Sequence, residues 1–279
     1  MNADAVLLWL AMALYALGLA LTVPSVARRR PLLSPSALGA LGLGLGFHAA
    51  SLAVRAAEIH RLLPITDVRS ALSSFTFLAT LAFFLVYLRY RIASLGLFML
   101  PLVLLLTLLS ALRAGSSFES PAFRSGWLLV HIASILLGYV GFFLTFVAAL
   151  MYLIKSRELK SKNPRAFYFR LPALDVCDQL YYRSLLFGLP GLSLGILTGF
   201  VWASRTWKGP WELDPKILAS IATWLIYLVL FATRLSGNWG GRRSAALAIL
   251  GFVAVLVTFL GISMWSGLHG YSPNFGGGK

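Results

Sequence analysis

Eight long apolar runs alternate with short polar segments, and this alternation is the strongest pattern in the sequence. Most runs are close to the ~20 residues that an α-helix needs to cross a hydrocarbon core ~30 Å thick. They cover approximately residues 5–23, 38–54, 71–88, 95–112, 127–154, 185–202, 217–233 and 245–265. The pattern predicts an all-α fold, a polytopic membrane protein with a bundle of about eight transmembrane helices. No soluble segment of domain size separates the runs, so we expect a single integral membrane domain over residues 1–279.

The composition supports a lipid bilayer as the surroundings of this chain. Hydrophobic residues make up 59% of it and charged residues only 12%, about half the charge of an ordinary soluble domain. The single cysteine, Cys177, excludes a disulfide framework and any cysteine-pair redox or zinc site within one chain. The net charge of +15 resides in short loops between the runs. That distribution is typical of membrane proteins and requires no nucleic acid as a partner.

The charged residues favour one orientation across the membrane. Basic residues cluster after the first, third, fifth and seventh runs, with the densest group between Lys155 and Arg170. Counted over all loops, 15 of the 24 basic residues but only three of the nine acidic ones lie on that side. Loops rich in Lys and Arg remain on the inner side of a membrane. With eight spans, both termini are then expected outside.

The stretch from Trp202 to Lys216, WASRTWKGPWELDPK, differs from everything around it. It joins the sixth and seventh runs on the outer side and carries three of the eight tryptophans, Trp202, Trp207 and Trp211. One interpretation is an aromatic belt at the membrane–water interface, where an apolar ring with one N–H is favoured. The other is a platform for a planar ligand. Asp214 precedes Pro215, a pair typical of the start of a helix.

Two histidines are expected at the depth of this tryptophan-rich segment. His131 lies at the outer end of the fifth run, and His269 lies just beyond the outer end of the eighth. Either one alone is typical of an ordinary interfacial histidine. Together they suggest haem, because neutral imidazole is a standard axial ligand of haem iron. Arg205 and Lys208 would then be available to the haem propionates.

A third histidine, His48, falls well inside the second run. Ionisable residues at such depth are candidates for function, although a hydrogen bond to a neighbouring helix is an equally physical reason for a histidine there. Gly42 and Gly46 of the same run are four residues apart, which predicts one helix face that a neighbour approaches closely. His60 is assigned to an outer loop.

These features resemble the cytochrome c assembly family of the CcsA (ResC) type over about residues 46–271. In that family a tryptophan-rich outer segment ends in Asp-Pro-Lys, with one outer histidine before it and one after it. The matching positions are Trp202, Trp207, Trp211, Asp214-Pro215-Lys216, His131, and His269 within Gly267–Tyr271. The resemblance implies that His131 and His269 ligate haem over the tryptophan-rich segment. It also implies that His48 belongs to an inner site where haem enters.

The sequence departs from the family pattern at four positions. It has a lysine where a glycine is usual, a leucine in place of the last tryptophan, an isoleucine in place of a glutamate, and an alanine in place of the second membrane histidine. These residues are Lys208, Leu213, Ile217 and Ala232. The outer ligands are thus retained, whereas the platform loses one tryptophan and the inner pair keeps only His48.

The resemblance implies a haem-handling membrane subunit of cytochrome c maturation. Such a subunit presents haem b at the outer face of the plasma or inner membrane for covalent attachment to apocytochrome c, together with a ResB/Ccs1-like membrane protein. The chain has no pair of thiols to relay, so its part would be ligation and positioning, and its residues leave open whether it is itself an enzyme. Two alternatives remain: a HemX-like protein that binds haem or regulates haem synthesis without attachment, and a structural or transport protein with an aromatic belt and no haem.

Overall fold

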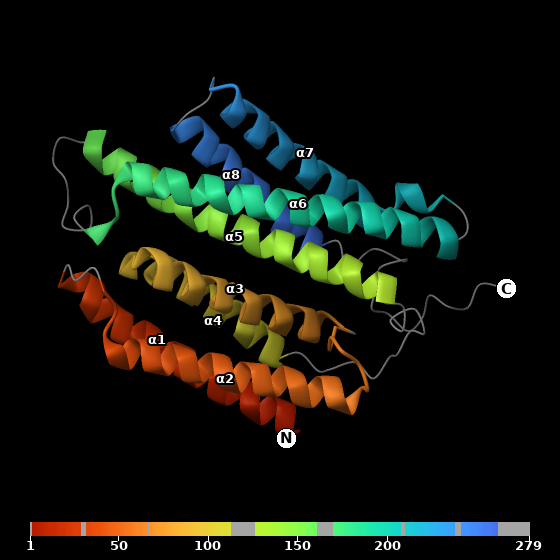
Figure 1. Ribbon diagram of the computed structural model, residues 1–279, viewed down its shortest axis with the longest axis horizontal. Coiled ribbons are helices and arrows are strands. Elements are labelled where there is room, and N and C mark those ends of the chain that lie inside the picture. The colour runs from red at the N-terminus through yellow and green to blue at the C-terminus, as the bar shows by residue number, and fades with distance from the viewer. Residues whose placement is uncertain are drawn as a thin grey trace. The chain divides into compact units, whose positions relative to one another are not determined.

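The computed structural model describes residues 2–28, 32–65, 67–112, 126–160, 170–207, 210–237 and 241–261. Within these ranges the regular elements are all helical, and eight helices are long and apolar enough to span a membrane (Figure 1). They are α1 (Ala3–Ala27), α2 (Pro35–Glu58), α3 (Val68–Tyr90), α4 (Ala93–Leu112), α5 (Gly126–Lys160), α6 (Leu174–Thr206), α7 (Pro215–Leu235) and α8 (Arg242–Leu256). A short 3-10 turn, η3 (Trp211–Leu213), precedes α7, and a π-helical turn, η4 (Val257–Gly261), extends α8. The prediction of eight spans in an all-α membrane protein is confirmed.

The chain forms two compact units, each built from spanning helices. The first unit is Met1–Ser117 with Arg157–Ala173, and the second is Phe118–Ser156 with Leu174–Lys279. The first unit therefore contains α1 to α4, in which α1 packs against α2 and α4, and α3 packs against α4. The second unit contains α6 to α8 and α5 as far as Ser156.

Close contact between α1 and α2 depends on glycines that leave room for large side chains. A Cβ atom added to Gly44 would stand 2.7 Å from the ring of Tyr15, and one added to Gly18 would stand 2.5 Å from Leu41. Gly42 and Gly46 have no atom within 4 Å of such a position. The prediction that those two glycines form the close face was therefore wrong. Residues two apart on a helix point in nearly opposite directions, so Gly44 faces the neighbour and its two companions do not.

Polar contacts tie the helix ends of the first unit together. Asp4, at the start of α1, forms an ion pair with Arg69 at the start of α3, with 3.1 Å between Oδ2 and Nη2. The Ser110 hydroxyl at the end of α4 donates to the carbonyl of Arg69 at 2.8 Å. The Ser51 hydroxyl of α2 donates to the carbonyl of Asp4 at 2.7 Å. All four helices are thus joined at one end of this unit.

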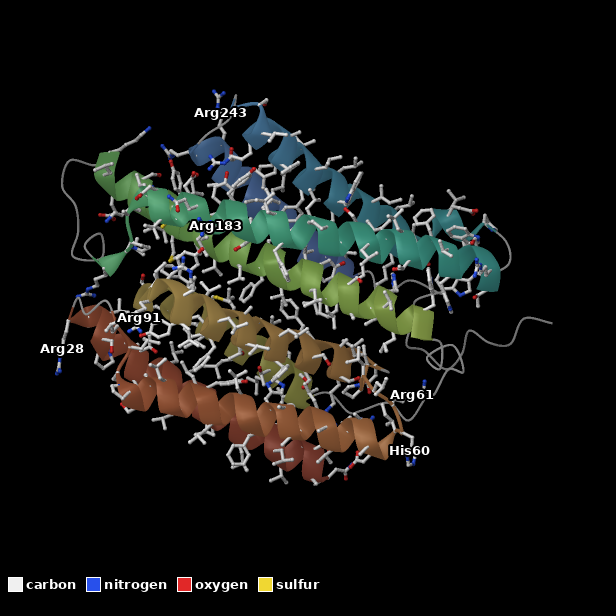
Figure 2. The ribbon with its side chains drawn as sticks, in the orientation of Figure 1. Arg28, His60, Arg61, Arg91, Arg183 and Arg243 are labelled. Atoms are coloured by element: carbon white, nitrogen blue, oxygen red, sulfur yellow. The ribbon has the colours of Figure 1, made fainter. Side chains whose placement is uncertain are left out.

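Figure 2 shows how labelled basic residues are distributed along the first unit. Arg28 and Arg91 lie at one end of its helices, and His60 and Arg61 lie at the other. The sequence assigned the loops that carry these two groups to opposite sides of the membrane. Within this unit the chain therefore crosses from end to end in the way that the alternation of loops predicts.

In the second unit α5 and α6 meet along a seam of glycines. A Cβ atom on Gly141 would stand 2.6 Å from the Cα atom of Gly188, and one on Gly138 would stand 2.7 Å from the amide nitrogen of Leu192. The two backbones are therefore in direct contact. Small residues allow such contact in membranes, where dispersion forces between helices replace the hydrophobic effect.

Aromatic stacking holds α7 and α8 against α5. The rings of Phe142 on α5 and Tyr227 on α7 are parallel, with centroids 3.6 Å apart. On the α8 side, Phe252 stacks on Phe146 with centroids 4.7 Å apart. Helix α5 therefore contacts both α7 and α8 within the second unit.

Two polar contacts join α6 to α7 along their length. The indole N–H of Trp224 donates to the hydroxyl of Ser193 at 2.8 Å. Near the far end of α7, Arg234 forms an ion pair with Asp178, and its guanidinium lies over the rings of Tyr181 and Tyr182. The tryptophan-rich segment thus links α6 and α7, two helices that also contact each other along their length.

Candidate functional site

The tryptophan-rich segment joins the end of α6 to the start of α7, as the sequence predicts. Helix α6 ends at Thr206, η3 covers Trp211–Leu213, and α7 begins at Pro215. Arg205 lies in the last turn of α6 and is exposed. Lys208, the other suggested propionate partner, lies outside the described residues.

The aromatic rings of this segment form two edge-to-face pairs. Trp202 and Trp207 have centroids 5.2 Å apart and ring planes at 84°. Trp211 pairs with Phe200 at 5.4 Å and 77°. Such perpendicular pairs are a favoured aromatic geometry. In this arrangement the three tryptophans do not share one plane, so a ligand would meet a mixture of ring faces and edges.

Phe200 belongs to the aromatic cluster although the sequence analysis did not select it. It lies near the end of α6 and contacts Trp211 across the turn between α6 and α7. The chain has 19 phenylalanines, and Phe200 lies within an apolar run, so no sequence signal distinguishes it from the others. Leu213, which stands where the family has its last tryptophan, is 69% exposed.

Asp214 caps the start of α7. Its Oδ1 atom accepts hydrogen bonds from the backbone N–H groups of Lys216 at 2.9 Å and Ile217 at 3.4 Å. Pro215 occupies the first helical position, where its missing N–H removes no hydrogen bond. The carboxylate is buried, with 6% of the residue exposed. The structural role expected of the Asp-Pro pair is confirmed.

His131 is held by the backbone of α6. Its Nδ1 atom lies 2.7 Å from the carbonyl oxygen of Gly195. A carbonyl oxygen only accepts hydrogen bonds, so Nδ1 carries the proton and donates it, and the lone pair of the neutral ring is on Nε2. A histidine that binds iron uses one ring nitrogen and commonly gives its other N–H to a carbonyl. The orientation of His131 therefore fits an axial ligand of haem.

Trp127 makes a parallel contact one turn earlier on α5. Its indole N–H donates to the carbonyl oxygen of Thr198 at 2.8 Å. Trp127 and His131 are four residues apart and lie on the same helix face. Both are thereby fastened to the last turns of α6, directly before the tryptophan-rich segment begins.

His269 lies outside the described residues, and the pairing of His131 with His269 stays a prediction. Over the described ranges, no group of three or more His, Cys, Asp or Glu side chains could hold a metal ion. A haem iron needs no such group from the protein, because the porphyrin supplies four of its ligands.

His48 lies in the core of the first unit and is completely buried. Its Nε2 atom is 3.0 Å from the hydroxyl of Ser73, and its Nδ1 atom is 3.3 Å from the hydroxyl of Tyr15. The ring also meets the edge of Phe77, with centroids 5.6 Å apart. This is the hydrogen-bonded alternative that the sequence analysis left open. Ligation by His48 stays a prediction, and it would require one of these two hydrogen bonds to be given up.

His60 is exposed at the end of α2, where Figure 2 labels it. It has a positive φ of 52°, in the left-handed region that closes helix ends. His60 thus lies in a loop, as predicted, and the assignment of that loop to the outer side of the membrane stays a prediction.

Comparison with known proteins identifies relatives over most of the chain. The family model for cytochrome C assembly protein matches residues 7–269. The chain is 30% identical over 233 residues to cytochrome c biogenesis protein CcsA of Guillardia theta, covering 75% of this chain and 76% of that protein. It is 31% identical to CcsA of Synechococcus sp. strain CC9902, covering 54% of this chain and 57% of that protein. For CcsA of Prochlorococcus marinus strain MIT 9301 the identity is 34%, covering 58% of this chain and 59% of the relative.

Proposed function

The chain belongs to the cytochrome c assembly protein family, and we propose that this multi-pass membrane protein binds haem b and presents it for attachment to apocytochrome c. The observation that carries the proposal is the hydrogen bond from His131 Nδ1 to the Gly195 carbonyl. It leaves the lone pair on Nε2, the form in which imidazole binds iron. A role in cytochrome c biogenesis follows from the family. The identity of the ligand as haem b and the side of the membrane on which it binds are our proposal.

The residues that would hold haem come from three separate parts of the second unit's sequence. His131 and His269 would be the axial ligands, and Trp202, Trp207 and Trp211 would contact the macrocycle. Arg205 and Lys208 would pair with its propionates, because guanidinium and ammonium groups bind carboxylates through charge-assisted hydrogen bonds. The site is proposed on the outer face of the plasma or inner membrane, where the charge pattern puts these segments.

The chain's own part in attachment would be binding and orientation. Haem supplies the vinyl groups to which the two cysteine thiols of an apocytochrome add, forming thioether bonds. Cys177 is fully buried, so it offers no thiol to this chemistry. His131 holds its proton on Nδ1 against the carbonyl of Gly195, and the tryptophan side chains would contact the macrocycle. We further propose a ResB-like membrane protein as the partner that completes the attachment machinery.

Two observations favour a second function, that of a HemX-like protein that binds haem or regulates its synthesis without attachment. His48 has both ring nitrogens in hydrogen bonds within the first unit. Ala232 stands where the resemblance leads us to expect a second membrane histidine, and it is exposed on α7. A chain without a working inner entry site could still bind haem at the outer site.

Expression of the full chain in cells that lack their own c-type maturation separates these functions. The chain would be produced with a ResB-like partner and an apocytochrome reporter. Covalent haem on the reporter is detected by peroxidase staining of a denaturing gel, and haem in the purified complex by its Soret band. We expect both signals. A Soret band without a stained reporter would support the HemX-like function, and no Soret band even after haem is supplied would contradict both.

A matched variant makes the comparison specific to the proposed site. His60→Ala changes an exposed histidine just after α2, in the first unit. It should retain the haem content and the reporter signal of the wild type. A loss in His60→Ala as large as in His131→Ala would contradict the assignment of haem to His131.

A further inference from the structure

The ring of His131 lies on Gly199, about two turns before the end of α6. A Cβ atom added to Gly199 would stand 2.6 Å from Cε1 and 2.7 Å from Nδ1 of His131, but 3.6 Å from Nε2. The Nδ1–Cε1 edge of the ring therefore faces α6, and Nε2 is the nitrogen farther from it. Ordinary contacts of a Cβ atom begin near 3.4 Å. No side chain fits at Gly199 while the ring holds this position.

The same turn of α6 supplies the acceptors for two side chains of α5. The carbonyl of Gly195 accepts from His131 Nδ1 at 2.7 Å and from the hydroxyl of Thr198 at 3.0 Å. The carbonyl of Thr198 accepts from the indole of Trp127 at 2.8 Å. These hydrogen bonds form next to the glycine seam, where the backbones of α5 and α6 are in contact.

We propose that the turn from Gly195 to Gly199 is the positioning element for His131. Gly199 provides the space that the imidazole ring occupies. The Gly195 carbonyl fixes the ring's rotation and keeps its proton on Nδ1, so that Nε2 is presented to a ligand. The inference rests on the proposed function, since it assumes that His131 is the residue that meets haem.

The physical consequence of a side chain at Gly199 follows from the distances. The ring would have to retreat by about 0.8 Å, the difference between 2.6 Å and the 3.4 Å at which ordinary contact begins. A retreat of that size strains the 2.7 Å hydrogen bond to Gly195, because hydrogen bonds weaken beyond about 3.2 Å. The loss of a partner that orients a metal-binding histidine typically costs about 10- to 100-fold in affinity.

The test measures haem content and the absorption spectrum of three variants of the full chain. Gly199→Ala should bind haem about 10- to 100-fold more weakly than the wild type, or lose the low-spin spectrum. Leu197→Ala is the control, since Leu197 lies in the same turn but is 64% exposed on the opposite face. It should keep wild-type haem content. His131→Gly tests the proposed function itself.

A double variant separates positioning from general damage to the helix pair. If Gly199 acts only through the His131 ring, Gly199→Ala should add nothing in a His131→Gly background. Added imidazole should then restore the spectrum equally in the single and double variants. A double variant that imidazole does not restore would show that alanine disturbs the packing of α5 and α6, and it would overturn the positioning role.

The outcomes for the two proposals are distinct. An unchanged spectrum in His131→Gly would overturn ligation by His131, and with it the function assigned to the turn. A changed spectrum in His131→Gly with an unchanged one in Gly199→Ala would leave ligation standing and overturn the inference. The inference is supported when both single variants change, the double variant is no worse than His131→Gly, and Leu197→Ala behaves as the wild type.

Discussion

Replacing Gly141 by alanine should separate α5 from α6 and destabilise the second unit. The new Cβ atom would stand 2.6 Å from Gly188 Cα, 2.7 Å from Gly188 N and 3.0 Å from the carbonyl of Ser184. All three are backbone atoms of α6, so no flexible side chain can make room. The helices would have to move apart by about 0.8 Å at this point to reach the 3.4 Å of ordinary contact.

The magnitude follows from two opposing effects. Overpacking of a well-packed interface costs about 1–3 kcal/mol, and contact with rigid backbone favours the upper end of that range. Alanine is a better helix former than glycine and returns about 1 kcal/mol. The overpacking term is larger, so we expect a net loss of about 2 kcal/mol in the free energy of unfolding.

Unfolding of the purified protein in detergent micelles, by denaturant titration, checks this value. Gly42→Ala is the matched control, since no atom lies within 4 Å of the added Cβ there. The control should be unchanged or more stable by up to about 1 kcal/mol. If Gly141→Ala proved as stable as Gly42→Ala, the close contact between the α5 and α6 backbones would be refuted.

Three further predictions concern separate parts of the chain. Asp214→Asn should keep the cap of α7, whereas Asp214→Ala should cost about 0.5–2 kcal/mol, measured by thermal unfolding; equal losses would contradict the capping role. His48→Ala should cost about 2–4 kcal/mol because it leaves a cavity and removes the partner of Ser73 and Tyr15, while the spectrum of the outer haem site stays unchanged; a shifted spectrum would contradict the separation of the two sites. A reporter that is active only outside the membrane should be active when fused after Lys279 and silent when fused within residues 155–170, and the reverse result would overturn the proposed orientation.

The eight helices could be predicted because the hydrocarbon core imposes one requirement on every span. Their ends were less predictable. The sixth apolar run was placed at 185–202, whereas α6 begins at Leu174. Asp175, Asp178 and Arg183 interrupt the apolar pattern in those extra turns, yet the backbone stays helical. Hydropathy predicts which residues are apolar enough to lie in the hydrocarbon core. The backbone hydrogen bonds of a helix can continue beyond that core, so hydropathy does not predict where the helix begins.

The candidate site was predictable in its residue types but not in its contacts. His131 could be selected from its depth and its relation to the tryptophan-rich segment. Its hydrogen bond to Gly195 could not, because that contact depends on the rotation of α5 against α6. The rotation is set by the glycines where the two backbones meet, and a glycine's spacing alone does not reveal which face is in contact. Gly42 and Gly46 failed as a prediction for the same reason.

The most direct test of ligation by His131 and His269 is the absorption spectrum of purified His131→Gly and His269→Gly before and after addition of imidazole. Imidazole supplies a missing axial ligand but cannot repair a misfolded helix bundle. We expect each variant to lose haem or its low-spin spectrum, and imidazole to restore that spectrum in both. An unchanged low-spin spectrum in both variants without imidazole would contradict the bis-histidine site and would leave the tryptophan-rich segment as an interfacial belt.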